Sequence, residues 1–191
     1  MDSVTSFIYG MSMMFFSMMA FLFWRKGKEM LFRMIMWLMI VVDLQLVKDL
    51  VFFLIYGFDN EHAWYLTSSL DMMIIPFYSF VLMELVKPGW FRWVKALMLE
   101  LPFLLLPVFY IFTHNIIWFY VLSVWGVIYG CSTFILLIFM IRRYHRQLKE
   151  RFSYQENINL NWLLAILNTF FLILFLWTLS CFVINVDYDN I

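Results

Sequence analysis

The chain alternates between six long apolar stretches and short polar breaks. Each apolar stretch reaches or exceeds the roughly 20 residues that a helix needs to cross a bilayer. Because a helix satisfies its backbone hydrogen bonds internally, such stretches predict membrane-spanning helices. The predicted helices cover residues 4–24, 31–56, 63–86, 95–114, 116–141 and 161–186. We therefore expect an all-α polytopic membrane helix bundle, with six transmembrane helices in a single transmembrane domain over residues 1–191.

The breaks contain residues that end helices. Gly27 follows the first stretch, at a position where glycine commonly adopts the left-handed conformation of a helix C-cap. The run Lys87-Pro88-Gly89 ends the third stretch, because proline cannot continue a helix and glycine permits the turn. Basic residues after the fifth stretch predict that its helix continues beyond the membrane as far as Arg151.

The composition indicates a membrane protein and excludes a typical soluble domain. Of the 191 residues, 65% are hydrophobic and only 14% are charged. A typical soluble domain is about half apolar and about a quarter charged. With so few charged groups, a folded chain of this size would expose a large apolar surface to water. We therefore expect the lipid bilayer to be its main partner.

Positive charge is confined to alternate breaks. Twelve of the thirteen Lys and Arg residues lie in or beside the first, third and fifth breaks. They are Arg25, Lys26, Lys28, Arg33, Lys87, Arg92, Lys95, Arg142, Arg143, Arg146, Lys149 and Arg151. Short loops rich in Lys and Arg stay in the cytoplasm. The pattern therefore predicts that both termini lie outside, an N-out and C-out orientation.

Polar residues inside the apolar stretches are the candidate functional groups. The second stretch carries Asp43, Gln45, Lys48 and Asp49. A charge at the centre of a bilayer costs about 2.5–3.5 kcal/mol on insertion scales, so each one needs a partner or a purpose. With about 100° between successive residues, Gln45, Lys48 and Asp49 share one face of a helix, and Asp43 points elsewhere.

The third stretch carries Asp71 and Glu84, and Asp71 matches Lys48 in depth. The second and third helices should form an antiparallel hairpin with a short outer loop. At about 1.5 Å per residue, Lys48 and Asp71 both lie roughly 12–14 Å below the outer boundary. Equal depth predicts a Lys48–Asp71 ion pair or a Lys48–Asp49–Asp71 cluster. Glu84 is close to the inner interface, where we expect its carboxylate to reach water.

Two interpretations of this cluster stay open. It can hold two helices together, or it can form a ligand-binding or switch site, since membrane proteins use the same groups for both purposes. Pro76 frees a backbone carbonyl near Met72 and can kink the helix. An acid beside a kink favours the interpretation as a ligand-binding or switch site. The candidate set is Asp43, Gln45, Lys48, Asp49, Asp71, Pro76 and Glu84.

Other signals are weaker. Gly126 and Gly130 form a small-residue face that suits packing within the chain better than a homodimer seam. His62 and His114 belong to outer breaks, and two loop histidines are usually solvated, so we expect no metal site. The sequence contains no phosphate loop, zinc-protease motif, nucleophile elbow or CxxC. We therefore expect no catalytic residues, no cofactor and no enzymatic activity.

Three stretches carry a resemblance to a known family. They are residues 45–49 (QLVKD), residues 71–76 (DMMIIP) with 84–90 (ELVKPGW), and residues 152–162 (FSYQENINLNW). With the six-helix spacing, they make the chain resemble the N-terminal multi-pass domain of membrane-anchored AraC-type helix-turn-helix transcription regulators. Related membrane domains also occur in front of sensor histidine kinases.

The resemblance implies a seven-helix sensor in a bacterial inner membrane, joined to a cytoplasmic effector. Six helices leave the C-terminus outside, so we expect that a seventh helix is missing or truncated and that these residues do not bind nucleic acid directly. The implied function is a signal-transmitting domain that responds to a periplasmic or membrane ligand. Two alternatives are a small transporter or proton-coupled carrier with a buried Lys/Asp site, and a membrane scaffold that dimerises through Gly126 and Gly130.

Overall fold

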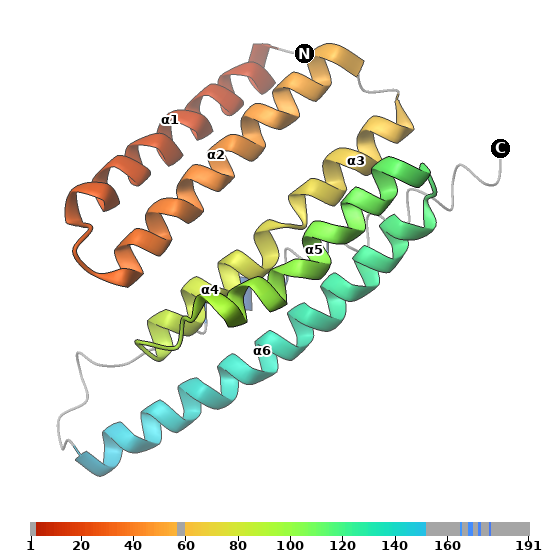
Figure 1. The fold of residues 1–191 in the computed structure, drawn as a ribbon. Helices are drawn as coiled ribbons and strands as arrows, with labels where there is room; N and C mark the ends of the chain where they lie inside the picture. The colour runs from red at the N-terminus through yellow and green to blue at the C-terminus, as the bar shows by residue number, and fades with distance from the viewer. Residues whose placement is uncertain are drawn as a thin grey trace. The chain divides into compact units, whose positions relative to one another are not determined.

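The computed structural model describes residues 3–56 and 60–151, together with the single residues 165, 168, 169, 172 and 176. These residues form helices joined by short turns, without strands, which confirms the all-α class. The helices are α1 (Ser3–Lys26), α2 (Met30–Tyr56), α3 (Glu61–Asp71), α4 (Ile74–Val86), α5 (Trp93–Thr113) and α6 (Ile117–Arg151) (Figure 1). Apart from the single positions, the predicted helix at 161–186 lies outside the described residues.

The chain forms two compact units, residues 1–122 and residues 123–191. The first unit contains α1 to α5 and the first residues of α6, and each side-chain contact described below lies within it. In the second unit, α6 continues to Arg151, which confirms the predicted extension of the fifth helix beyond residue 141.

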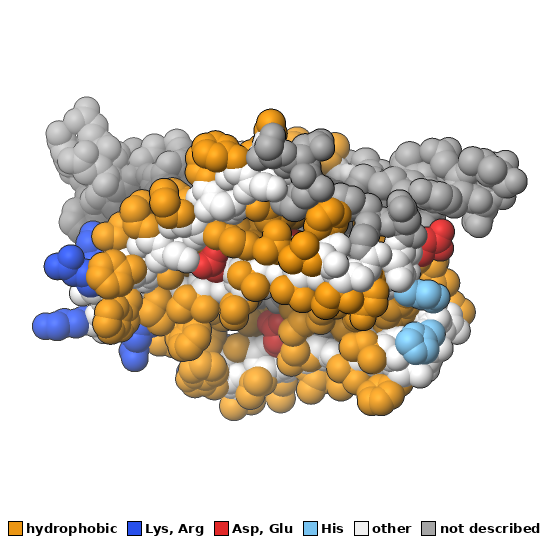
Figure 2. All heavy atoms as spheres, turned by 90° about the horizontal axis from the view of Figure 1, so that it is seen from above, with side chains coloured by type: hydrophobic (Ala, Val, Ile, Leu, Met, Phe, Trp, Pro, Cys, Tyr) orange, Lys and Arg blue, Asp and Glu red, His pale blue; other side chains and the backbone are white. Residues whose placement is uncertain are grey.

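Four helical segments are long and apolar enough to cross a membrane. They are Val4–Lys26, Glu61–Val86, Trp93–Thr113 and Ile117–Tyr144. Many of their large apolar side chains are exposed, and apolar side chains cover much of the surface in Figure 2. Such exposure is expected where lipid tails rather than water surround a helix, because the tails are as apolar as leucine. The helices are therefore compatible with a membrane protein.

α2 has 27 residues and agrees with the predicted helix 31–56 to within one residue at each end. Its two buried residues, Met34 and Leu38, pack in one cluster with Phe80 and Val81 of α4 and Ala96 of α5. This apolar cluster holds the first half of α2 beside α4 and the start of α5.

The predicted third helix is divided in two. α3 ends at Asp71 and α4 begins at Ile74, with Met72 and Met73 in a turn between them. Proline lacks a backbone N–H, so Pro76 cannot donate to the Met72 carbonyl four residues earlier. That carbonyl instead accepts from the N–H of Ile75 at 3.1 Å, in a tighter turn of three residues. The predicted kink is therefore a break one turn before the proline.

The ends of the first unit differ in charge. Lys26 ends α1 and Lys28 lies in the turn that follows it, and the α4–α5 loop carries Lys87 and Arg92. The apolar cluster of α2, α4 and α5 contains residues close to both segments, so the two basic segments lie at the same end. His114 lies at the other end of α5 from the basic α4–α5 loop, and His62 lies close to His114.

One predicted helix cap is wrong, and another was not predicted. Gly27 does not adopt the left-handed conformation. A Cβ atom added there would lie 2.9 Å from the Trp24 carbonyl oxygen, so close backbone approach is the reason for glycine. The left-handed C-cap occurs instead at His114, with φ of 50°, at the end of α5. Residues other than glycine seldom adopt this conformation, so no pattern in the sequence indicated it.

Candidate intramembrane polar site

The polar side chains of α2 point in two directions, as their helical spacing predicted. Gln45 and Lys48 contact α3, and Asp49 lies beside Lys48. Asp43 contacts α1 instead. The two faces of α2 therefore form separate polar contacts, and only the first contains the predicted cluster.

Lys48 and Asp71 form the predicted ion pair. Lys48 Nζ donates to Asp71 Oδ1 at 2.6 Å and to the Thr67 carbonyl oxygen at 3.0 Å. Exposure is 16% for the Lys48 side chain and 37% for the Asp71 side chain. A hydrogen-bonded pair between partly buried charges is stronger than a surface ion pair, which typically contributes about 0–1 kcal/mol. The pair joins α2 to the last residue of α3.

Asp49 adds a second carboxylate to the cluster. Its Oδ1 lies 2.9 Å from Lys48 Nζ, within ion-pair distance. The direction of approach does not meet hydrogen-bond geometry, and this buried oxygen has no hydrogen-bond partner among the described residues. The contact with Asp71 is therefore the stronger of the two, because it combines a shorter distance with a hydrogen bond. One lysine thus lies beside two carboxylates.

Gln45 contacts the backbone at the break between α3 and α4. Its Nε2 lies 3.3 Å from the Leu70 carbonyl oxygen and 3.4 Å from that of Asp71. In an unbroken helix the Asp71 carbonyl would accept from the N–H of Ile75, which here donates to Met72. Unsatisfied backbone groups are costly in a membrane. Gln45 therefore supplies a donor to the Asp71 carbonyl that the break has released, and adds a second contact to the Leu70 carbonyl, which accepts from the N–H of Met73 at 3.2 Å.

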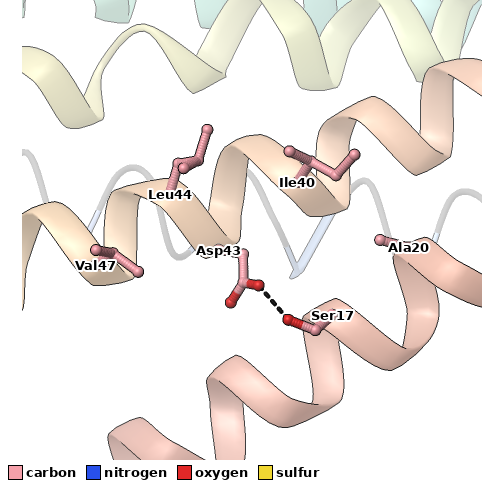
Figure 3. A pocket seen from close by; sticks show the side chains of 6 residues that line it. All are labelled: Ser17, Ala20, Ile40, Asp43, Leu44 and Val47. Carbon is pink, nitrogen blue, oxygen red and sulfur yellow. Dashed lines mark hydrogen bonds between the residues drawn. The ribbon is translucent and has the colours of Figure 1, made fainter.

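Asp43 faces α1, on the other side of α2 (Figure 3). The hydroxyl of Ser17 donates a short hydrogen bond to Asp43 Oδ2. The other carboxylate oxygen, Oδ1, is buried and lacks a hydrogen-bond partner in the described part of the chain. Asp43 is also the midpoint of α2 (Met30–Tyr56), the position farthest from either end of the helix.

Glu84 is not part of the Lys48 cluster, and the expectation that its carboxylate reaches water is wrong. The residue is only 5% exposed. Its Oε1 accepts from the N–H of Gly89 at 2.6 Å, and its Oε2 accepts from the N–H of Phe91 at 2.8 Å. Gly89 has a φ of 80°, which glycine adopts without strain. Glu84 therefore folds the α4–α5 loop back over the end of α4, a structural role.

His62, in the first turn of α3, and His114, at the C-cap of α5, lie close together. Their ring centroids are 6.2 Å apart, and His62 Nδ1 lies 3.3 Å from the Tyr110 hydroxyl. The part of the chain that the structure describes contains no group of three or more metal-ligating side chains. Structural zinc sites use four protein ligands. The expectation of no metal site stays a prediction.

Ser17 and Thr67 belong to these contacts but were not predicted from the sequence. Ser17 interrupts the Met-rich run of α1, and Thr67 contributes only its backbone carbonyl. Hydroxyl groups inside helices usually bond to their own backbone, so a serine in an apolar run is not a specific signal. Any residue type can supply a carbonyl. Gly126 and Gly130 lie one turn apart on α6, and their role in packing stays a prediction.

Comparison with known proteins adds no relative. No family model, no curated protein and no solved structure matches the chain. The geometry of the polar site is therefore the main basis for a proposal about function.

Proposed function

We propose that this chain is the membrane-embedded sensor domain of a transcription-regulatory or kinase signalling protein. The observation that carries the proposal is that Lys48 lies beside two acids, one of which is the last residue before a helix break. A signalling domain needs an element with two discrete arrangements. A lysine that can change partners next to a hinge meets this need. The sequence resemblance to membrane domains of AraC-type regulators agrees with this role.

The proposed hinge is the turn at Met72 and Met73. In the arrangement described here, Lys48 donates to Asp71 and so holds the end of α3 against α2. In the second arrangement Lys48 bonds to Asp49 alone, and the released α3 end lets α4 change its angle. The α4–α5 loop, which Glu84 couples to the end of α4, then moves with it. A periplasmic or membrane ligand that binds one arrangement better would shift the balance between the two.

The proposed topology has six spans, with both termini outside a bacterial inner membrane. α2 and residues 161–186 would add two spans to the four long apolar segments. The common position of the two basic segments at one end of the first unit supports this topology, since basic loops stay in the cytoplasm. Reporter fusions at Asn60 and Gln147 should report opposite sides of the membrane, with Asn60 outside. Fusions that report the same side would contradict the topology.

The switch is tested in the full chain extended by a seventh helix and an AraC-type DNA-binding module, with transcription as the output. Asp49→Asn leaves Asp71 as the ionised partner of Lys48 and should hold the arrangement described here. Asp71→Asn should favour the second arrangement, so the two variants should shift output in opposite directions. Glu61→Gln is the matched control for the loss of one acid. Shifts of the same sign, or none, at equal insertion and protein level would contradict the switch.

The helix break also favours a second candidate, a small transporter or proton-coupled carrier. Broken helices supply carbonyls and carboxylates to ions and substrates in transporters. The Asp71 carbonyl is of this kind, although Gln45 contacts it. If this candidate is correct, purified protein in liposomes will move protons or a solute, and Asp71→Asn will abolish the flux. The transcriptional output of the reporter fusion would then be the same whether Lys48 pairs with Asp71 or with Asp49.

A further inference from the structure

A pocket of about 270 Å³ lies between α1 and α2 (Figure 3). Its lining residues are Ser17, Ala20, Ile40, Asp43, Leu44 and Val47. Ser17 and Asp43 are the polar members, and the other four are aliphatic. Leu44 and Val47 are 62% and 43% exposed, so the pocket opens on the lateral surface of the helix pair.

Asp43 is the chemically distinctive group of this pocket. No ion pair joins its carboxylate to a Lys or Arg in the described residues, in contrast to the acids beside Lys48. Ser17 satisfies Oδ2, and Oδ1 is buried without a hydrogen bond from the described part of the chain. A buried acceptor without a donor is costly, and a carboxylate is more so at the midpoint of a helix that the proposed topology places across the membrane. The residues that line the pocket therefore include no positively charged donor for the Asp43 carboxylate.

We propose that this pocket binds a small amphiphile with a protonated amine, which enters sideways from the bilayer. The ammonium group would lie beside the Asp43 carboxylate and neutralise its charge. The alkyl chain would cover the aliphatic walls formed by Ala20, Ile40 and Leu44. At about 30 Å³ for each atom, the share of a water molecule in the liquid, the volume suits roughly nine non-hydrogen atoms. This binding does not depend on the proposed role of Lys48.

Other ligand classes fit the pocket less well. A fatty acid or another anion would be repelled by the Asp43 carboxylate. A neutral alcohol could donate one hydrogen bond but would leave the charge unpaired. A divalent metal ion such as Ca²⁺ needs six to eight oxygen ligands, and the lining side chains offer one carboxylate and one hydroxyl. An alkylamine supplies both the charge and the apolar surface that the pocket requires.

The binding is tested with photo-crosslinking of the full chain in phospholipid nanodiscs. The probe is a straight-chain alkylamine with a diazirine in the chain, and the control probe is the alcohol of the same length. Mass spectrometry of the labelled peptides should place the amine label on residues 17–20 and 40–47. Octan-1-amine should compete with the label, whereas octan-1-ol and octanoate should compete weakly or not at all.

Two variants separate the charge from the shape of the pocket. Asp43→Asn keeps the shape and a bond from Ser17 but removes the charge, and should weaken competition by octan-1-amine about ten- to hundredfold, as expected for a charge-assisted bond. Ala20→Phe keeps the charge and fills the space, and should abolish labelling. Glu61→Gln, which removes an exposed acid outside the pocket, should have no effect.

Melting temperatures of all variants establish that each is folded. Equal labelling by the amine and alcohol probes would overturn the proposal, as would amine labelling that survives both pocket substitutions. Labelling spread over every lipid-facing helix would have the same meaning, because it would show partition into the bilayer rather than binding.

Discussion

The two faces of α2 place acids in an apolar environment in different ways. On the face toward α3, Asp71 accepts from the ammonium group of Lys48, and Gln45 adds contacts to the backbone. On the face toward α1, Asp43 accepts from a single hydroxyl, that of Ser17, and borders a pocket. The first face supplies its own counter-charge, whereas the described residues supply none on the second. The difference separates an internal contact from one that an external ligand can complete.

Burial follows the same division. α4, which continues from α3, has most of its residues buried, among them Phe80 and Pro76 with almost no exposed surface. In α1, Ala20 is the buried core residue of the described part, and many large side chains are exposed. α1 packs along α2 more extensively than any other helix does in the described residues, but it buries few of its own side chains.

The largest expected effect is on the face toward α3. Asp71→Ala leaves Lys48 without its strongest partner and should lower the free energy of unfolding by about 2–4 kcal/mol, somewhat below the 3–5 typical of fully buried pairs because Asp71 is partly exposed. Lys48→Met combined with Asp71→Ala should cost less than Asp71→Ala alone. The measurement is unfolding in mixed detergent micelles. Additive costs would show that the two residues do not interact.

Glu84 offers a comparison with an acid that bonds only to backbone. Glu84→Ala leaves the N–H groups of Gly89 and Phe91 without their acceptor and should cost about 2 kcal/mol. Because Glu84 shares no partner with Lys48, its cost should add to that of Lys48→Met in the same unfolding measurement. A coupling above about 0.5 kcal/mol between them would contradict the separation of the loop from the cluster.

A smaller effect is expected at the helix break. Gln45→Leu removes two long hydrogen bonds, one of them to the released Asp71 carbonyl, and should cost about 1 kcal/mol. Pro76→Ala restores a backbone N–H and allows the helix to close, so Gln45→Leu should cost almost nothing in that background. Hydrogen exchange of residues 72–76 should slow in Pro76→Ala. If Gln45→Leu costs as much in the Pro76→Ala background as it does alone, the stabilising contact of Gln45 does not depend on the helix break.

The smallest effect is expected on the face toward α1. Ser17→Ala removes one interhelical hydrogen bond, which in membrane proteins is worth on average about 0.6 kcal/mol. The loss should be the same with or without Lys48→Met, since the two contacts lie on different faces of α2. If Ser17→Ala lowers the free energy of unfolding as much as Asp71→Ala does, the two faces of α2 do not differ in the way proposed.

The Lys48–Asp71 contact could be predicted because an antiparallel helix hairpin relates position in the chain directly to depth. Pro76 indicated a disturbance of the third helix, since the missing N–H is a property of the residue itself. Glu84 could not be interpreted in this way. Its partners are N–H groups of a loop, and the path of that loop follows from packing rather than from residue type.

The sequence by itself determined most of the helix ends in the described residues, although not the break at Met72 and Met73. It could do so because the free energy of placing a segment in an apolar medium depends mainly on its length and composition. It also determined which residues of α2 share a face, because the helical repeat is constant. Only the tertiary structure decided that Ser17 meets Asp43, that Gln45 meets the break, and that Glu84 bonds to the loop. These contacts depend on the rotation of each helix about its axis and on the packing of its neighbours, which many side chains decide together.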